Sequence, residues 1–147
     1  MSLDVASALR TAIVANTTIT NLITTYQNAP SVHTRVPTPD NVVLPYIVIG
    51  PDIAITDFDA LTSRRPLVIR DVFVYGTAGS SRQDDYRKVE TIGYTLRNLF
   101  HRNPDSITVD GYQVVAIEAN GPRPAPTNDE EVIGRLVSLS IRLRSVS

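Results

Sequence analysis

The clearest pattern in the chain is a change of hydrophobic period between residues 65 and 100. Apolar β-branched and aromatic residues crowd the segment Leu67–Tyr75 and occupy both of its faces, which predicts a central strand covered on both sides. After a turn of small residues, apolar side chains recur at three- and four-residue steps over Arg82–Phe100, which predicts an amphipathic helix. The apolar stripe of this helix consists of Tyr86, Val89, Ile92, Gly93, Leu96, Leu99 and Phe100.

Residues with short polar side chains indicate where the helices begin. Ser2 is the expected N-cap of a first helix, and Thr18 of a short second one. Ser80 is the expected N-cap of the long helix, with Gln83 at the reciprocal position of a capping box. The first helix carries an apolar stripe of Val5, Ala6, Leu9, Ala12 and Ile13, and the second carries Ile19, Leu22 and Ile23.

The segment between these helices and the central strand predicts an irregular crossing followed by a hairpin. Proline, threonine and asparagine dominate residues 26–43, where we expect only a short extended piece at His33–Val36. Leu44-Pro45 opens a strand of alternating isoleucine and valine, which continues past a bulge at Gly50. Residues 57–65 then form the loop of a hairpin that leads into the central strand.

The chain after the long helix predicts a second hairpin, a loop and a final strand. Ser106–Val109 and Tyr112–Glu118 flank Asp110-Gly111, a pair typical of a type I′ turn. Residues 121–131 hold three prolines and three acids, which predicts a long exposed loop. Alternation in the last strand places Val137, Leu139, Ile141 and Leu143 on one face and Ser138, Ser140, Arg142 and Arg144 on the other.

These elements indicate an α/β protein of the α+β type. We expect a single small domain spanning residues 1–147, with a mixed or antiparallel sheet and two main helices packed on it. The net charge is −1, which disfavours electrostatically driven binding to nucleic acid or membranes. The absence of cysteine excludes disulfides, thiolate chemistry and cysteine-ligated zinc. No apolar run has the length of a membrane span, and the N-terminus lacks the features of a secretion signal.

The residues that could carry chemistry lack suitable partners. His33 and His101 have no metal-ligating residue at a recognisable spacing, and the end of a helix favours a dipole or carbonyl contact for His101. No nucleophile elbow or glycine-rich phosphate loop is present, and Asp84 and Asp85 already occupy the positive end of the long helix. We therefore expect no catalytic, cofactor-binding or metal site, and no enzymatic activity.

Two acidic clusters favour interface or solvated charge over a metal site. Asp57 and Asp59 lie in the predicted hairpin beside Arg64 and Arg65, and residues 129–131 form a second cluster in the proline-rich loop near Arg123. Arg142 and Arg144 face away from the apolar side of the last strand. We expect Asp57, Asp59, Arg64, Arg65, Arg142 and Arg144 to form subunit or partner contacts.

Three motifs together resemble the tail-terminator family of long-tailed bacteriophages, also called tail-completion or tail-to-head joining proteins. Leu44-Pro45-Tyr46 resembles the usual start of a strand in that family. The strand Val68–Tyr75, with its small-residue turn and Asp-rich helix start, resembles the family's central junction, and the closing strand alternates arginine with leucine. The similarity covers nearly the whole chain, although the proline-rich stretch Gly121–Pro126 is longer than the family pattern.

The resemblance implies a structural virion protein that forms a hexameric ring. Such a ring caps the tail tube, ends its polymerisation and joins the tail to the head connector or neck protein, at the tail–head junction of a virion assembled in the host cytoplasm. DNA would only pass through its lumen, and no membrane is involved. A ring needs two different complementary faces on each subunit.

Two other functions also fit the sequence. One is another neck, head-completion or minor tail component, which would bind the portal instead of the tube protein. The other is a cellular α/β binding module or small hydrolase, which a pocket around His33, His101 or the Asp57/Asp59 pair would favour.

Overall fold

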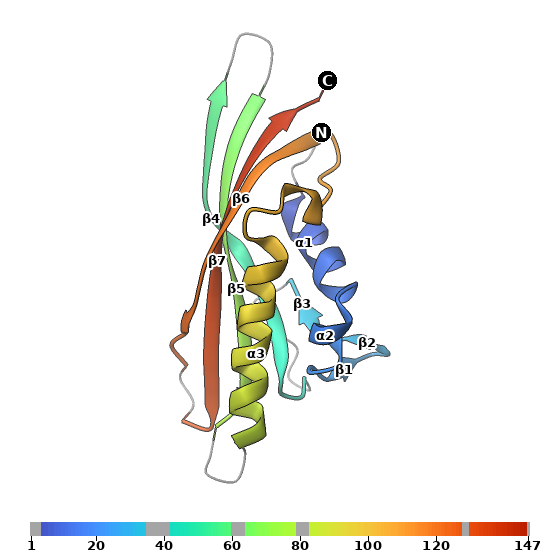
Figure 1. Cartoon of the computed structure of the whole chain (residues 1–147), viewed down its shortest axis with the longest axis vertical. Helices are drawn as coiled ribbons and strands as arrows, with labels where there is room; N and C mark the ends of the chain where they lie inside the picture. Colours follow the sequence, from blue (N-terminus) through green and yellow to red (C-terminus); the bar gives the residue numbers. More distant parts are fainter. Residues whose placement is uncertain (1–3, 35–41, 60–63, 79–82, 128–129, 147) are drawn as a thin grey trace.

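The computed structural model describes residues 4–34, 42–59, 64–78, 83–127 and 130–146. Within these ranges a five-stranded sheet has the strand order β3-β4-β5-β7-β6, and the helices lie on one of its faces (Figure 1). The helices are α1 (Val5–Val14), α2 (Thr17–Thr20) and α3 (Gln83–Phe100). The strands of the sheet are β3 (Val32–His33), β4 (Tyr46–Asp59), β5 (Arg64–Thr77), β6 (Tyr112–Pro124) and β7 (Val132–Ser145). Among the strands of the described residues only β3 and β4 pair in parallel, so the predicted α+β class with a mixed sheet is confirmed.

The hydrophobic core lies between the helices and one face of the sheet. β5 pairs with β4 on one side and β7 on the other, and it buries Val68, Val72 and Val74 completely. The predicted alternation of β7 is confirmed, since alternate residues between 137 and 143 are buried while Arg142 and Arg144 are exposed. The predicted helix over Arg82–Phe100 is confirmed from Gln83 onward, and its core residues are Val89, Ile92, Leu96 and Phe100.

Two features of the predicted core are wrong. Tyr86 was expected in the buried stripe of the helix, but 50% of its surface is exposed. The apolar residues on both faces of β5 predicted helices or strands on both sides, yet the helices lie on one side only (Figure 1). On the other face Ile69, Phe73 and Tyr75 are half-buried, and the rings of Phe73 and Tyr75 pack against each other and against Tyr46. We call this the open face of the sheet.

Glycine allows α3 to pack closely on β6. A Cβ atom added to Gly93 would lie 2.7 Å from Cβ of Pro122, which is closer than real Cβ atoms come to a neighbour. Because this position cannot carry a side chain without moving the strand, Gly93 fixes the distance between α3 and the edge of the sheet.

The first two helices are capped by residues other than the expected ones. The Asp4 side chain accepts a hydrogen bond from the Ser7 N–H at 3.0 Å, and the Asn16 side chain accepts one from Ile19 N–H at 3.1 Å. Thr18 lies inside α2, so it is not the cap; Ser2 and Ser80 lie outside the described residues. In both helices the cap oxygen belongs to the residue three positions before the donor, as N-cap geometry requires.

The segment after α2 contains more regular secondary structure than its composition predicts. Strands β1 (Thr25–Tyr26) and β2 (Ala29–Pro30) form a small antiparallel hairpin. Its turn residues, Gln27 and Asn28, have φ angles of 51° and 65°, which is the left-handed conformation of a type I′ turn. The expected extended piece at His33–Val36 corresponds in part to β3; residues 35–41 lie outside the described chain.

The predicted bulge at Gly50 is confirmed. The register between β4 and β5 shifts between Ile49 and Asp52 and again between Asp52 and Ala54. β4 therefore runs through Gly50-Pro51 as a single long strand, and the β4–β5 hairpin extends beyond the helices (Figure 1).

The predicted hairpin at residues 106–118 is wrong. Residues 104–106 form a 3-10 turn, 107–109 form no strand, and the partner of β6 is β7. Tyr112 N–H donates to the Val109 carbonyl at 3.1 Å across Asp110-Gly111. Only Gly111 of that pair has a positive φ, 82°, which fits a type II turn and not type I′.

The proline-rich loop predicted at residues 121–131 is partly strand. β6 continues to Pro124 past a register shift between Asn120 and Arg123, with Arg123 opposite Leu136 and Pro124 opposite Arg135. Because β6 is an edge strand, an imino nitrogen without a proton need not break the ladder. No helix in the described part of the chain is long and apolar enough to cross a membrane.

Leu96 tests the packing of α3 on the sheet. It is fully buried, so we expect Leu96→Ala to lower the free energy of unfolding by about 2–5 kcal/mol through lost contacts and a residual cavity. The exposed Asn98 on the same helix provides the control, since Asn98→Ala should change stability by about 0.5 kcal/mol or less. Urea denaturation measures both, and equal midpoints for the two variants would contradict this placement.

Candidate functional site

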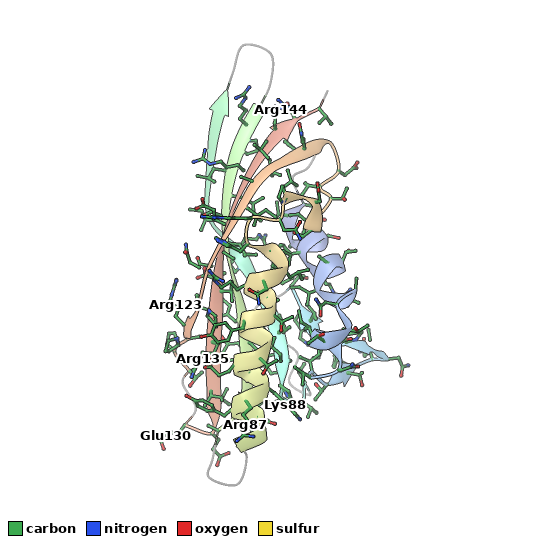
Figure 2. All side chains as sticks on the ribbon, viewed as in Figure 1. Arg87, Lys88, Arg123, Glu130, Arg135 and Arg144 are labelled. Atoms are coloured by element: carbon green, nitrogen blue, oxygen red, sulfur yellow. The ribbon has the colours of Figure 1, made fainter. Side chains whose placement is uncertain are left out.

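Three of the arginines expected in contacts gather at the hairpin end of the sheet. Arg65, Arg142 and Arg144, which we call the arginine patch, line a depression of about 380 Å³ together with Leu67 and Val115. All three arginines are exposed, and Arg144 donates a hydrogen bond to the Gln113 side chain on β6. Figure 2 places Arg144 at this end of the molecule, beyond the helices. The patch therefore combines positive charge with apolar surface.

The remaining predicted contact residues lie on the same β4–β5 hairpin. The strand register places Asp57 opposite Pro66 and Asp59 opposite Arg64, whereas Arg65 is opposite Phe58. Opposite positions in an antiparallel pair share a face and successive positions alternate. The side chains of Asp57, Asp59 and Arg64 lie outside the part of the chain that the structure describes, so the contacts expected of them stay a prediction.

A continuous row of aromatic rings crosses the open face. Ring centroids are separated by 5.5 Å between Tyr26 and His33, 5.9 Å between His33 and Tyr46, 5.6 Å between Tyr46 and Tyr75, and 6.1 Å between Tyr75 and Phe73. Each ring is half-buried, so the row covers part of a sheet face on which no helix lies. Burial, together with the neighbouring Tyr46, raises the pKa of Tyr75.

His33 is part of this row and also bonds to a buried serine. The Ser31 hydroxyl, which is fully buried, lies 2.7 Å from Nε2 of His33. Burial lowers the pKa of His33, and the positive charge of Arg10 lowers it further. A serine–histidine contact can activate a nucleophile, but this hydroxyl has no access to a substrate. The pair therefore fixes the His33 ring against the residue that joins β2 to β3.

His101 accepts a hydrogen bond from the edge strand β6. The Ala119 N–H donates to Nδ1 of His101 at 3.0 Å, and the adjacent Arg102 N–H donates to the Ile117 carbonyl at 2.8 Å. Both β6 groups point outward from the sheet, where an unpaired edge strand would otherwise expose them. We expected His101 to contact carbonyls at the end of its helix, whereas it accepts a hydrogen bond from a strand.

The acidic start of α3 has a structural partner. Asp85 is only 8% exposed, and its carboxylate accepts a hydrogen bond from Thr77 N–H at 3.0 Å. Thr77 is the last residue of β5, so this bond ties the end of the central strand to the first turn of the helix. The carboxylate also occupies the positive end of the helix dipole.

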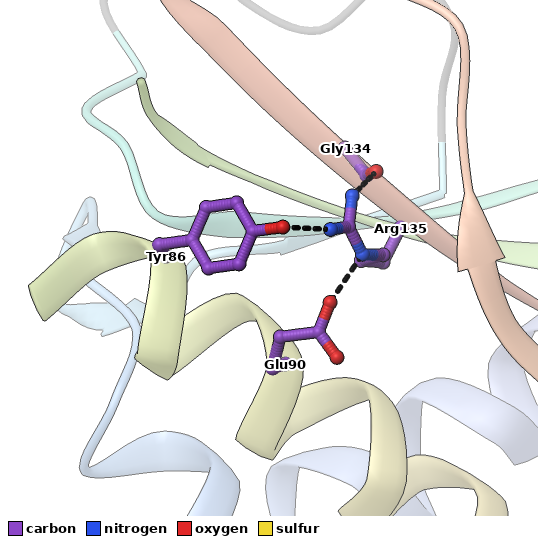
Figure 3. A network of polar contacts seen from close by, with 4 residues as sticks. All are labelled: Tyr86, Glu90, Gly134 and Arg135. Atoms are coloured by element: carbon purple, nitrogen blue, oxygen red, sulfur yellow. Dashed lines mark hydrogen bonds and ion pairs between the residues drawn. The ribbon is translucent and has the colours of Figure 1, made fainter. Parts of the chain in front are cut away.

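Sequence reasoning missed the polar contact that joins α3 to β7. Arg135 on β7 pairs with Glu90 on α3, and it donates hydrogen bonds to the Tyr86 hydroxyl and the Gly134 carbonyl, both at 2.9 Å (Figure 3). Its guanidinium carbon lies 5.2 Å from the centre of the Tyr86 ring. The only available clue was that Tyr86 and Glu90 are four residues apart and share a helix face.

The acidic clusters do not assemble a metal site in the described part of the chain. No group of three or more histidine or acidic residues there has the geometry to hold a metal ion. Of the cluster at residues 129–131, Glu130 and Glu131 are exposed and Asp129 lies outside the described residues. Glu130 lies at the opposite end of the molecule from Arg144 (Figure 2).

The lowered pKa of His33 predicts a loss of stability in acid. In the unfolded chain His33 binds a proton near its ordinary pKa of 6.5, whereas in the folded chain its pKa is lower. The contribution of neutral His33 to the free energy of unfolding is therefore fully present above pH 6.5 and is lost as the pH falls through the folded pKa. We expect His33→Gln to flatten the pH dependence of the unfolding free energy in this window. Urea melts at several pH values measure it, and parallel curves would contradict the assignment.

The Arg135–Glu90 pair predicts a measurable coupling between α3 and β7. The two side chains are 15% and 34% exposed, so water only partly screens their charges. A double-mutant cycle with Arg135→Gln and Glu90→Gln should give a coupling energy of about 1 kcal/mol in unfolding experiments. The coupling should shrink at high salt, and additive effects of the two substitutions would show that the pair contributes nothing.

Comparison with known proteins identifies a shared fold. No family model matches the sequence, and no curated protein matches it either. Among solved structures, one chain from the virion of a native gene transfer agent (GTA) particle superimposes with a TM-score of 0.74. The alignment covers 96% of this chain and 95% of that chain at 12% sequence identity. At this identity the similarity establishes that the two chains have the same fold from end to end.

Proposed function

We propose that this chain is a structural protein of a phage-like virion, and that it forms the ring that caps the tail tube. The observation that carries the proposal is the match of the whole fold to a chain of a gene transfer agent virion. The strand start at Leu44-Pro45-Tyr46 and the strand–turn–helix junction that follows β5 resemble the tail-terminator family independently of that match. In this role the ring ends tube polymerisation and joins the tail to the head connector.

The distribution of surfaces supports assembly into a ring. One face of the sheet is covered by the molecule's own helices (Figure 1), and the other is open and lined by aromatic rings and the arginine patch. A closed ring needs heterologous contacts, in which two different surfaces of one subunit meet. A protein whose two sides differ this strongly meets that requirement.

The polar contacts support a structural role over a catalytic one. Ser31 is bonded to His33, Asp85 to the backbone of Thr77, and His101 to the backbone of Ala119. Each of these groups would be a candidate for acid–base or nucleophilic chemistry if it were aimed into a cleft. Each is instead engaged in a contact that holds neighbouring parts of the fold together.

The proposal predicts a ring that stops tube growth. We expect light scattering and native mass spectrometry of the purified protein to show a hexamer, the state that the family resemblance implies. Added to polymerising tail tube protein from the same particle, it should bind tube ends and limit tube length.

Two results would contradict the ring and capping role. A monomer at all concentrations, with tubes that grow to unchanged length, would exclude it. Binding to the portal ring instead of tube ends would reassign the protein to the neck of the particle.

A further inference from the structure

Arg142 and Arg144 are held at fixed positions on the open face of the sheet. Both lie on β7, which pairs with β5 on one side and with β6 on the other. Arg142 is opposite Leu67 on β5, and its neighbours Ile141 and Leu143 are buried in the hydrophobic core. Because side chains alternate along a strand, Arg142 and Arg144 both point to the open face, about 7 Å apart.

Among the described residues, neither of these two guanidinium groups is paired with a carboxylate. The Arg142 side chain has no hydrogen bond or ion pair within the described ranges, and the Arg144 side chain donates to the neutral side chain of Gln113. Both arginines are exposed. Each therefore keeps its positive charge and unused N–H donors, and a planar guanidinium group can bind a carboxylate through two parallel hydrogen bonds.

Apolar surface lies beside the two charges. The depression of about 380 Å³ that the arginines line also contains Leu67 and Val115, and Val115 leaves 51% of its surface exposed. This volume is in the lower part of the range of about 300–1,000 Å³ that ligand pockets occupy. An exposed arginine next to an exposed apolar side chain is typical of a surface that a partner protein buries.

A peptide suits this surface better than a nucleic acid does. A second depression, of about 140 Å³, shares Leu67 and Arg142 with the first and is also lined by Glu118 and Ser140. The Glu118 carboxylate repels the phosphates of a nucleic acid, whereas it can accept hydrogen bonds from the N–H groups of a peptide. The net charge of −1 also gives the chain little general attraction to a polyanion.

We propose that Arg142 and Arg144 bind an extended acidic segment of a partner protein. In an extended segment, carboxylates at alternate positions lie on one face with the same spacing of about 7 Å as the two arginines, so each carboxylate can pair with one guanidinium group. Apolar side chains on the same face of the segment would cover Leu67 and Val115. This binding does not require a ring, so it goes beyond the proposed function.

Fluorescence anisotropy of labelled peptides with blocked termini tests the spacing. The probe is the heptapeptide Leu-Ser-Glu-Ser-Glu-Ser-Leu, which places both glutamates and both leucines on one face when it is extended. Its control, Leu-Ser-Ser-Glu-Glu-Ser-Leu, has the same composition, but its adjacent glutamates point to opposite faces. We expect the probe to bind about tenfold more tightly than the control peptide and to lose affinity at high salt.

Paired substitutions locate the binding site. Arg142→Gln with Arg144→Gln should weaken binding of the probe at least about tenfold, because both charge-assisted pairs are lost. Arg87→Gln with Lys88→Gln removes the same number of charges at the opposite end of the molecule (Figure 2) and should leave binding unchanged. Val115→Ser keeps every charge and should weaken binding about threefold, because apolar contact is lost.

Circular dichroism checks that each variant is folded. If Arg142→Gln with Arg144→Gln does not fold, Arg142→Lys with Arg144→Lys replaces it. The lysine side chains keep the charge but lose the planar fork, so binding of the probe should still weaken about threefold.

Four results would overturn the inference. Equal affinities for the two peptides would show that the spacing is not recognised, and normal binding of the probe by the Arg142/Arg144 variant would place the site elsewhere. Tighter binding of a seven-nucleotide oligothymidylate, lost in the same variant, would identify a phosphate site. An oligomer of the unmodified protein that this variant fails to form would show that a second copy covers the patch. The capping role is tested separately by tube length, so it would survive a failure here.

Discussion

The burial of one face of the β5–β7 pair under α3 determines the rest of the molecule. Val72 and Val137 lie opposite each other, and both are fully buried on the helix side. Because side chains alternate along a strand, the residues directly before and after each buried one must then face the open side of the sheet. A slip of one residue in β7 would bury Arg142 and expose Ile141, so the same interaction that forms the core also holds the arginine patch on the outside.

A sheet with one open face and two edges exposes groups that could bind other chains indiscriminately. The fold limits this exposure with local devices. Tyr46 and Tyr75 belong to the ring row that covers apolar atoms of the open face, and the residues that follow α3 satisfy outward-pointing groups of β6 at Ile117 and Ala119. Pro122 and Pro124 offer no N–H to another strand at the end of the same edge. These devices leave less of the sheet open to unspecific pairing with another strand.

Sequence periodicity predicted the parts of the fold that are set by burial. The strand around Leu67–Tyr75, the helix that ends at Phe100 and the alternation of β7 all follow from which positions must avoid water. The errors arose where geometry depends on a partner distant in the chain. β6 can extend to Pro124 because β6 is an edge strand, and its position in the sheet depends on distant strands. The role of Arg135 depends on its contact with Glu90, which is 45 residues away in the chain. Neither condition produces a pattern in the local sequence.

Net charge illustrates the same limit for the candidate site. A value of −1 indicates that charge plays little part, yet Arg65, Arg142 and Arg144 gather around one depression of the sheet. Arg65 and Arg142 are far apart in sequence, yet strand pairing brings both to the same depression. Net charge does not reveal such local gathering of like charges. A nearly neutral chain can therefore present a locally basic surface while having little general affinity for polyanions.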